Sequence, residues 1–366
     1  MKRDRIFDLG ACFKNTFQGR RVLVTGHTGF KGSWLTAFFN KLNVHIEGYA
    51  LTPATIPSHF NLLQDDSKTT IADILDTQKL DDAIAAAQPD IIFHLAAQAL
   101  VRTSYTKPVN TYQTNVMGTL NVLEAARKCK SVKAVVLITT DKVYENKEWD
   151  KPYVETDELG GFDMYSSSKA CCEILINSYR NSFFNMASYK TKHDVLIASA
   201  RAGNVIGGGD WSPDRLIPDI AAATSNGEKV QIRNPASVRP WQHVLDCLYG
   251  YLLLGAKLLN EETAFAGAWN FSPNSSEVKN VEAITTIAKE NWNKINIEFG
   301  KPVDDLHEAG LLTLDNTKAI TKLGWKPVWN TTEAVQKTIS WYKEYYESGK
   351  IMTDENITDY LKSIKP

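Results

Sequence analysis

Short apolar runs alternate with amphipathic stretches along most of this chain, and this alternation predicts a parallel sheet with helices between its strands. The runs have the length and the continuous apolar character of strands that are buried on both faces. Those expected as strands are 22–24, 44–51, 71–74, 90–97, 132–139 and 195–201. Those with helical character are 33–42, 79–87, 109–128, 164–184, 218–225 and 246–259, with two or three more amphipathic helices between 280 and 366.

Strands that alternate with helices in this way form a doubly wound α/β fold. We therefore expect a Rossmann-type parallel sheet with a smaller C-terminal α/β domain beside it. Residues 1–20 are mostly polar and are expected on the surface.

Three glycines, Gly26, Gly29 and Gly32, follow the first apolar run and precede the first helical stretch. Glycine permits the dihedral angles of a tight turn, and the missing Cβ lets a phosphate approach the backbone. The amides that open the helix then face the ligand, and the helix dipole favours negative charge there. Phe30, in the same turn, is also expected at the cofactor. This order of strand, turn and helix predicts a site for the pyrophosphate of a dinucleotide.

The second strand ends without the acidic residue that usually holds the ribose hydroxyls of NAD. It continues into Leu51 and Thr52, and no arginine stands there to suit a 2′-phosphate. We expect NAD, held weakly at its ribose, with Asp73 accepting a hydrogen bond from the adenine amino group. His27 and Lys31 in the glycine turn are expected on the phosphates, although each could equally be a solvated side chain.

The composition excludes several kinds of function. The chain has 366 residues, of which 43% are hydrophobic and 23% charged, and a net charge of −1, so no global field favours nucleic acid or a membrane surface. No apolar run reaches the roughly 18 residues that span a bilayer, and no apolar core follows the basic N-terminal residues as it would in a secretory signal. The five cysteines show no C-x-x-C spacing, which predicts free thiols in a reducing cytoplasm and no metal site.

Polar side chains stand at the end of the fifth apolar run, where ligands meet a parallel sheet. They are Thr140, Asp141 and Lys142. Farther on, Tyr165 and Lys169 lie four residues apart at the start of a helix, so they share one face. A lysine ammonium beside a phenol lowers the pKa of the phenol, and we expect this pair to provide a base that works near neutral pH.

Five motifs lie in the order and at the spacing of the extended short-chain dehydrogenase/reductase family. They are V-T-G-H-T-G-F-K-G-S-W-L (24–35), H-L-A-A-Q (94–98), T-N-V-M-G-T (114–119), T-T-D-K-V-Y-E-N (139–146) and Y-S-S-S-K (165–169). Within this family the chain resembles the nucleotide-sugar 4,6-dehydratases over almost its whole length. H-T-G-F-K-G-S-W, T-D-K and R-P-W-Q-H-V together resemble the branch that acts on CDP-glucose, which implies a role in deoxysugar biosynthesis such as that of lipopolysaccharide O-antigen.

The resemblance implies that CDP-D-glucose loses water to give CDP-4-keto-6-deoxy-D-glucose. Tyr165 would take the proton of the 4-hydroxyl while a hydride passes from C4 to NAD, with Lys169 holding the phenolate and the nicotinamide ribose and Thr140 bonding the same oxygen. A base would then take the C5 proton, Asp141, protonated through a raised pKa, would protonate the departing C6 hydroxyl, and the hydride would return to C6. Lys142 stands where the dTDP-glucose type has a glutamate, and it is either the C5 base or a charged group that stabilises the enolate.

Further binding residues follow from the sheet edge and from the resemblance. An arginine fork matches phosphate oxygens, so Arg239 is placed first on the substrate pyrophosphate, although a surface ion pair is an equally good reading of any one arginine. The further cofactor residues expected are Ile74, Leu95, Ala96, Ala97, Gln98 and Asn115, and the substrate residues are Arg102, Asn204, Arg215, Arg233, Arg239 and His243.

We expect two domains. Residues 1–203, with a return segment at 240–270, are expected to bind NAD, and residues 204–239 and 271–366 to bind the sugar nucleotide. By analogy with the family, the chain pairs as a homodimer or a higher homo-oligomer through the helices at 109–128 and 165–184.

Other functions remain open. A sugar-nucleotide 4-epimerase or decarboxylase on the same fold shares Tyr165 and Lys169, but it needs no acid–base pair beside Thr140. Another nucleotide-sugar 4,6-dehydratase would differ only in its nucleotide. A non-catalytic NAD-sensing protein would explain the missing ribose acid, but not the complete set of catalytic residue types.

Overall fold

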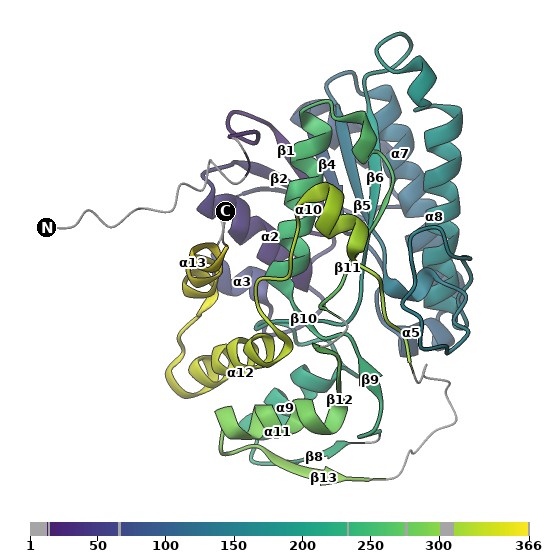
Figure 1. Ribbon diagram of the computed structural model, residues 1–366. Helices are drawn as coiled ribbons and strands as arrows, with labels where there is room; N and C mark the ends of the chain where they lie inside the picture. The colour runs from purple at the N-terminus through teal and green to yellow at the C-terminus, as the bar shows by residue number, and fades with distance from the viewer. Residues whose placement is uncertain are drawn as a thin grey trace, which may run out of the picture.

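The computed structural model describes residues 13 and 15–364, apart from 65–66, 233, 275–276 and 301–310. At its centre lies a sheet of seven parallel strands in the order β11-β6-β5-β4-β1-β2-β3 (Figure 1). The strands are β1 (Val22–Thr25), β2 (Ile46–Ala50), β3 (Lys68–Ile71), β4 (Ile91–His94), β5 (Ala134–Ile138), β6 (Leu196–Ala202) and β11 (Ala268–Phe271). The direction of winding reverses between β1 and β4, and ligands of such sheets bind outside the carboxyl ends of the strands at that point.

Helices cover both faces of this sheet (Figure 1). One face carries α4 (Thr77–Ala87), α7 (Gly118–Lys128) and α8 (Met164–Ser182), and the other carries α2 (Phe30–Lys41) and α10 (Val244–Leu259). Short helical pieces complete this part of the chain. They are α3 (His59–Leu63), α5 (Val101–Thr106), α6 (Pro108–Tyr112), η1 (Gln113–Met117), η2 (Asp141–Val143), η3 (Met186–Ser188) and η4 (Thr263–Phe265). In the described part of the chain, no helix combines the length and the apolar character that crossing a bilayer requires.

The two faces enclose two separate apolar clusters because successive residues of a strand point to opposite sides. Leu23, Ile92 and Val135 belong to the cluster under α4, α7 and α8. Val22 and Val136, one position away, belong to the cluster under α2 and α10. Burial on both faces is why these strands are continuously apolar in the sequence, and the predicted doubly wound α/β class is confirmed.

Three elements differ from the sequence prediction. The third strand is Lys68–Ile71 rather than 71–74, and the seventh, Ala268–Phe271, was not predicted because four residues carry too little periodicity. The helix expected at 109–128 is divided by the π-helical turn η1, which shifts its register between α6 and α7.

The expectation that residues 1–20 lie on the surface is wrong for Phe13 and Phe17, which are both buried. The ring of Phe13 packs edge-on against Phe38 and that of Phe17 against Phe39, both on α2. Two aromatic side chains bury enough apolar area to draw a polar segment onto the core.

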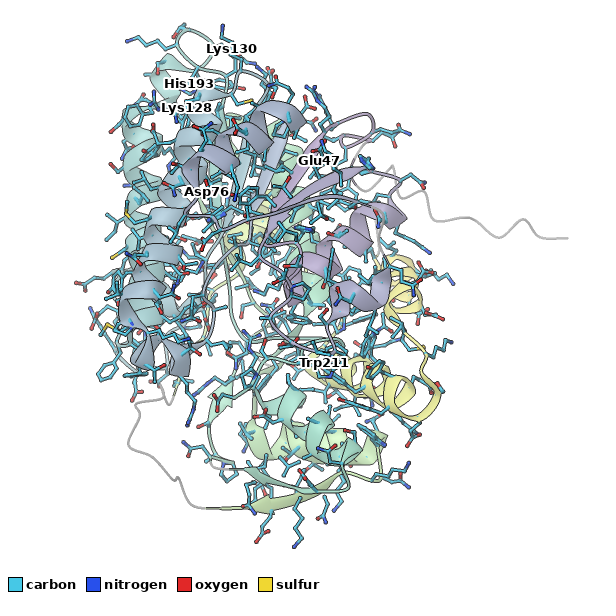
Figure 2. All side chains as sticks on the ribbon, turned by 180° about the vertical axis from the view of Figure 1, so that it is seen from behind. Glu47, Asp76, Lys128, Lys130, His193 and Trp211 are labelled. Carbon is cyan, nitrogen blue, oxygen red and sulfur yellow. The ribbon has the colours of Figure 1, made fainter. Side chains whose placement is uncertain are left out.

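A smaller group of elements lies below the sheet in Figure 1. Its members are β7 (Val205–Ile206), α9 (Leu216–Ser225), β8 (Lys229–Ile232), β9 (Val238–Arg239), β10 (Gln242–His243), β12 (Lys279–Asn280), α11 (Val281–Asn291), β13 (Asn296–Phe299) and α12 (Thr331–Ser348). The π-helical turn η6 (Ala319–Leu323) packs instead on α10 and β11. Trp211 packs edge-on against Trp341 and Tyr345 of α12 (Figure 2). The last helix, α13 (Thr353–Ser363), packs instead on α2, where Lys41 pairs with Asp354 at 2.8 Å. The division into two domains stays a prediction, but this packing assigns α13 to the sheet side.

A buried carboxyl group connects these parts. Asp246, in the first turn of α10, accepts hydrogen bonds at Oδ1 from the Val328 amide at 2.7 Å and from the Tyr360 hydroxyl at 2.9 Å. Its Oδ2 atom has no hydrogen-bond partner among the described residues. Burial therefore raises the pKa of Asp246 to about 7.

We expect Asp246 to make stability depend on pH in a defined direction. In the unfolded chain the carboxyl ionises near its ordinary pKa of about 3.9, whereas in the folded protein it holds its proton to about pH 7. Its contribution is therefore present below pH 4 and is lost as the pH rises through 7. In Asp246→Asn this loss disappears, so the unfolding free energy of the variant should rise relative to the parent by a few kcal/mol between pH 4 and 8, at about 1.4 kcal/mol per pKa unit. Urea unfolding at several pH values measures this difference, and parallel curves would contradict it.

Candidate active site

One cavity of about 1170 Å³ opens at the carboxyl ends of the central strands and extends to the smaller group of elements. Pockets for a single small ligand have roughly 300–1,000 Å³, so this one has room for a dinucleotide and a second ligand. The predicted residues that line it are Gly26, Gly29, Phe30, Lys31, Gly32, Thr52, Asp73, Ile74, Leu95, Ala96, Ala97, Gln98, Arg102, Thr140, Asp141, Lys142, Tyr165, Lys169, Asn204, Arg215 and Arg239. Their individual roles stay predictions.

The glycine turn has no room for side chains at two of its three glycines. Gly26 has a φ of +73°, and a Cβ there would lie 2.6 Å from the amide nitrogen of Ala96. A Cβ on Gly32 would lie 2.2 Å from the carbonyl oxygen of Gly26. The turn is therefore closed tightly against the end of β4, and α2 begins at once after Gly29, its N-cap. The amides of its first turn meet the cavity, which fits the pyrophosphate of a dinucleotide.

The part of the cavity expected to hold the adenosine end of NAD lacks the usual acidic residue after β2, as the sequence predicts. Thr52 and Asp73 line the cavity after β2 and β3. Asp73 accepts a hydrogen bond from the Leu75 amide at 2.9 Å, which fixes its carboxylate at the turn. No acidic residue follows β2 directly, where Leu51 and Thr52 stand.

His27 does not reach the cavity, and the expectation that its side chain binds phosphate is wrong. Its ring is buried between β2 and β3, where Nε2 is 3.0 Å from the Thr69 hydroxyl. A Cβ on Gly48 would lie 2.3 Å from that ring, so Gly48 provides the space that the imidazole occupies. The ring also packs edge-on against Phe60.

Asn115 also lies behind the cavity wall, which corrects its assignment as a cofactor contact. Its Oδ1 accepts from the Gln98 amide at 2.9 Å, and its Nδ2 donates to the Gln98 carbonyl at 3.0 Å and to the Ser168 hydroxyl at 2.8 Å. It thus joins the loop after β4 to α8, and it supports Gln98 rather than a ligand.

The end of β5 brings Thr140, Asp141 and Lys142 to the centre of the cavity. Thr140 Oγ1 donates to Asp141 Oδ1 at 2.9 Å, and Lys142 Nζ donates to the same oxygen at 3.3 Å. Asp141 is 1% exposed, and its Oδ2 has no hydrogen-bond partner among the described residues. A Cβ on Gly203 would lie 3.3 Å from Oδ2, so the absence of a side chain there leaves space beside the carboxyl.

The first turn of α8 presents Tyr165 to the same cavity. Burial raises the pKa of Tyr165 to about 12, the Thr140 side chain acts in the opposite direction, and the charge of Asp141 adds to the rise. The pKa of Tyr165 is therefore raised in this structure, and the expected effect of Lys169 on it stays a prediction. Lys169 Nζ donates to the Ile138 carbonyl at 3.2 Å, and burial lowers the pKa of Lys169 itself.

Lys31 extends from the glycine turn toward the catalytic end of the cavity. Burial lowers the pKa of Lys31, and the positive charges of Arg215 and Lys142 lower it further, while Asp141 opposes them. The charge of Lys31 also lowers the pKa of Lys169. Lys31, Asp141 and Lys142 line the same cavity, so the charges of the last two act on the pKa of Lys31.

Three arginines line the cavity on the substrate side. Arg215 Nη1 donates to Asp210 Oδ2 at 2.9 Å, and Arg239 Nη1 donates to the Val238 carbonyl at 2.8 Å. Arg102 lies 3.6 Å from a carboxylate oxygen of Asp214. These contacts hold the guanidinium groups along the wall, where phosphate binding stays a prediction.

One predicted substrate residue, His243, does not line the cavity. His243 is fully buried, its Nδ1 accepts from the Leu245 amide at 3.2 Å, and its ring packs edge-on against Trp329. It caps α10 instead of contacting a ligand, so that assignment is corrected, and burial lowers its pKa to about 3. Arg233 lies outside the described residues.

Sequence reasoning missed the polar groups that support the site from behind, chiefly the buried pair of Glu173 and Arg201. Glu173 continues the four-residue spacing of Tyr165 and Lys169 on α8, and that spacing was a signal that could have found it. The cysteines in the described residues are free thiols, as expected, and the same residues contain no cluster of His, Cys, Asp and Glu that could hold a metal ion.

Comparisons with known proteins agree with this arrangement. A family model described as GDP-mannose 4,6 dehydratase matches residues 23–338. A CDP-glucose 4,6-dehydratase of Salmonella typhimurium is 46% identical, over 96% of this chain and 98% of that protein. A dTDP-glucose 4,6-dehydratase of the same organism is 26% identical, over 88% of this chain and 92% of that protein.

Solved structures with low sequence identity share the fold. A UDP-glucose 4-epimerase of Thermotoga maritima, solved with UDP-glucose, has a TM-score of 0.76 at 22% identity. The aligned region covers 89% of this chain and 100% of the epimerase chain. A dTDP-glucose 4,6-dehydratase of Bacillus anthracis, solved in complex with NAD, has a TM-score of 0.73 at 21% identity. The aligned region covers 90% of this chain and 98% of the dehydratase chain.

We expect Gly32→Ala to weaken dinucleotide binding, because its Cβ would displace the carbonyl of Gly26 and open the turn. Isothermal titration with NAD should show an affinity lower by about tenfold or more, which is about 1.4 kcal/mol. Gly267→Ala is the matched control, since the nearest atom to its Cβ is 3.9 Å away. Equal NAD affinities of Gly32→Ala and the parent would contradict the assignment of the turn.

Proposed function

This chain belongs to the GDP-mannose 4,6 dehydratase family, and from that premise we propose that it converts CDP-D-glucose to CDP-4-keto-6-deoxy-D-glucose with NAD as cofactor. The observation that carries the proposal is the contact of Lys142 Nζ with Asp141 Oδ1 at 3.3 Å, in the cavity that Tyr165 also lines. Oxidation and reduction at C4 need only a phenol for the hydroxyl proton and a nicotinamide for the hydride, whereas elimination of water also needs an acid and a base such as the pair beside the phenol. The relative with 46% identity has the corresponding name.

The cavity offers NAD a place along the glycine turn. Its amides at Phe30 and Lys31 suit the pyrophosphate, and Thr52, Asp73 and Ile74 line the far end. NAD, when bound there, would accept the C4 hydrogen with its electron pair and return that pair to C6, and its positive ring would favour the phenolate form of Tyr165. This protein carries no acid for the ribose directly after β2, so we expect NAD to be exchangeable.

Tyr165 takes the proton of the sugar 4-hydroxyl in this proposal. The Thr140 side chain favours the ionised phenol, and Lys169, buried one turn along α8, would stabilise negative charge at this end of the cavity when it is protonated. Once C4 is a ketone, the hydrogen at C5 becomes acidic.

Asp141 and Lys142 then act on C5 and C6. The carboxylate–ammonium pair and the acid–amine pair contain the same number of protons, so a proton moving across the 3.3 Å contact converts one into the other. In this proposal the acid–amine form of the pair carries out the reaction. The amine of Lys142 takes the C5 proton, and the acid of Asp141 gives its proton to the departing C6 hydroxyl.

Incubation with CDP-glucose and NAD tests the activity directly. We expect a 4-keto-6-deoxy product, followed by its absorbance in alkali, with no net consumption of NAD. A different hexose would indicate a 4-epimerase, and unchanged CDP-glucose together with NAD binding would indicate a sensor. Parallel reactions with UDP-, GDP- and dTDP-glucose test the choice of nucleotide.

Two variants of Lys142 separate the roles of base and charge. Lys142→Met should stop elimination while still forming bound reduced nicotinamide, because Tyr165 and Thr140 remain. Lys142→Arg keeps the positive charge but provides no neutral amine, so it should fail in the same way if Lys142 is the base. Rapid-scan absorbance and product analysis measure both steps. Turnover by Lys142→Arg would mean that charge alone suffices, and turnover by Lys142→Met would exclude the role.

We also propose that the assembly is a homodimer through α6, α7 and α8. Large apolar side chains are exposed at Val109 of α6, Met117 of η1, Ile174 of α8 and Phe183 directly after α8. Both α6 and η1 pack on α8, and exposed apolar side chains on neighbouring elements suit a second copy of the same surface. Ile174→Asp should give monomers by light scattering, whereas Ile71→Asp should not, since its side chain is similarly exposed (49% against 58%) on the edge strand β3. A parent that is monomeric, or a dimer that survives Ile174→Asp, would refute this interface.

A further inference from the structure

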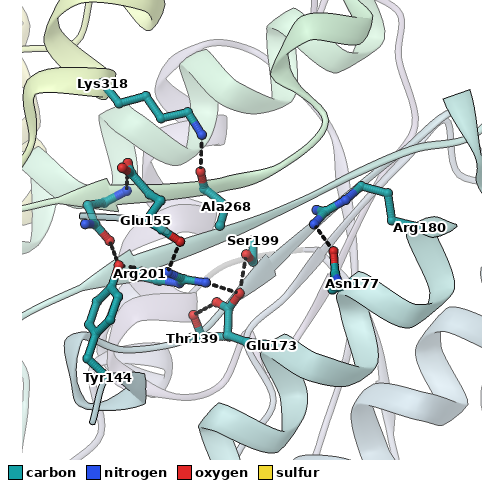
Figure 3. Close-up of polar contacts among 11 residues, drawn as sticks. Thr139, Tyr144, Glu155, Glu173, Asn177, Arg180, Ser199, Arg201, Ala268 and Lys318 are labelled. Carbon is teal, nitrogen blue, oxygen red and sulfur yellow. Dashed lines mark hydrogen bonds and ion pairs between the residues drawn. The ribbon is translucent and has the colours of Figure 1, made fainter. Parts of the chain in front are cut away.

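A buried ion pair that the proposed reaction does not use lies directly behind the catalytic strand end (Figure 3). Glu173 of α8 and Arg201 of β6 are joined at 2.8 Å, with side chains 3% and 4% exposed. Neither residue lines the cavity. Burying two charges costs free energy unless hydrogen bonds satisfy them, so the partners of this pair show what it holds in place.

Glu173 holds the start of the catalytic segment. Its Oε1 accepts from the Thr139 hydroxyl at 2.5 Å, and its Oε2 accepts from Ser199 Oγ and Arg201 Nη2, both at 2.8 Å. Burial alone would raise the pKa of Glu173, but the charge of Arg201 and these hydrogen bonds lower it below its ordinary value. The group is therefore a carboxylate, and Thr139 is the residue directly before Thr140.

Arg201 holds the other end of the same segment. Its Nη1 donates to the Tyr144 hydroxyl at 2.7 Å and to the Glu155 carbonyl at 3.2 Å, and the guanidinium carbon lies 5.0 Å from the centre of the Tyr144 ring. The Tyr144 hydroxyl donates in turn to Asn270 Oδ1 at 2.8 Å. Tyr144 directly follows η2 (Asp141–Val143), so one ion pair fixes the chain on both sides of residues 140–143.

The pair also ties this segment to the helix that carries the phenol. Tyr165, Lys169 and Glu173 lie four residues apart on α8 and therefore share a face. Tyr165 and Lys169 line the cavity, and Glu173 accepts a hydrogen bond from the Thr139 hydroxyl. The Glu173–Thr139 bond thus sets how far the acid–amine pair stands from the Tyr165 hydroxyl.

We propose that Glu173 and Arg201 are positioning residues for the dehydration, and that they hold Asp141 and Lys142 in register with Tyr165. The inference rests on the proposed function, because it concerns the geometry of that reaction. Neither residue lines the cavity, and both act through Thr139 and Tyr144, which line it but whose hydroxyls bond to Glu173 and Arg201. A displacement of about 1 Å at a reacting group can cost about a hundredfold in rate, so the loss of either tether should be measurable in turnover.

The test removes one tether at a time and leaves the ion pair intact. Thr139→Val removes the hydroxyl that donates a hydrogen bond to Glu173, and Thr139→Ser restores a hydroxyl at that position. Tyr144→Phe removes the hydroxyl that accepts a hydrogen bond from Arg201. Tyr360→Phe is the matched control, because it also removes one buried hydroxyl bonded to a carboxyl, that of Asp246, away from the cavity. Melting temperatures and NAD affinities of all four variants are measured beside the kinetics.

We expect Thr139→Val and Tyr144→Phe to keep the KM and the NAD affinity of the parent while kcat falls about tenfold to a hundredfold. Bound reduced nicotinamide should accumulate in both, since Tyr165 stays in place on α8 while the steps at C5 and C6 depend on the displaced segment. Thr139→Ser should recover most of the rate, and Tyr360→Phe should keep the kcat of the parent even if its melting temperature falls.

Parental kcat in Thr139→Val and Tyr144→Phe would overturn the proposal. So would a loss of rate that follows the melting temperature, without accumulation of reduced nicotinamide and without recovery in Thr139→Ser. Failure of the parent itself to convert CDP-glucose would instead reject the proposed function. In that case a crystal structure of Tyr144→Phe tests the positioning role by itself. A shift of the Asp141 carboxyl relative to Tyr165 would support that role, and an unchanged position would refute it.

Discussion

The contact between the Asp141 carboxyl and the Lys142 amine, at the tip of β5 and beside the Tyr165 phenol, is the interaction on which this account depends. Parallel strands place their carboxyl ends along one edge of the sheet, so side chains that are far apart in the chain meet there. Asp141 is buried and its second oxygen has no partner among the described residues, whereas the Lys142 side chain is partly exposed to the cavity. The proposed reaction places the substrate against this pair.

Basic side chains lie near this pair. Lys31, Lys169 and Arg215 line the same cavity, and burial lowers the pKa of both lysines. Desolvated cations of this kind attract anions strongly, and NAD and a nucleoside diphosphate sugar each carry a pyrophosphate. The arrangement therefore explains why the cavity suits two anionic ligands, although the net charge of the chain is only −1.

The sequence predicted features that depend on local order. The alternation of strands and helices, the glycine turn and the four-residue spacing of Tyr165 and Lys169 are visible over short stretches, and the structure places the last two features along one cavity. It could not predict the direction of side chains whose surroundings come from distant segments. His27 turns toward Thr69 and His243 toward Trp329, and neither choice leaves a trace in the flanking residues. The Glu173–Arg201 pair likewise joins a helix to a strand 28 positions away, so only the spacing of Glu173 hinted at it.

The most direct test of the central claim follows one hydrogen atom. CDP-glucose carrying deuterium at C4 is converted with catalytic NAD, and the product is examined by mass spectrometry and NMR. If oxidation, elimination and reduction occur on one hexose in one cavity, every product molecule should carry that deuterium at C6, with a solvent proton at C5. Deuterium returned to C4, or appearing in free cofactor or in the solvent, would contradict the account.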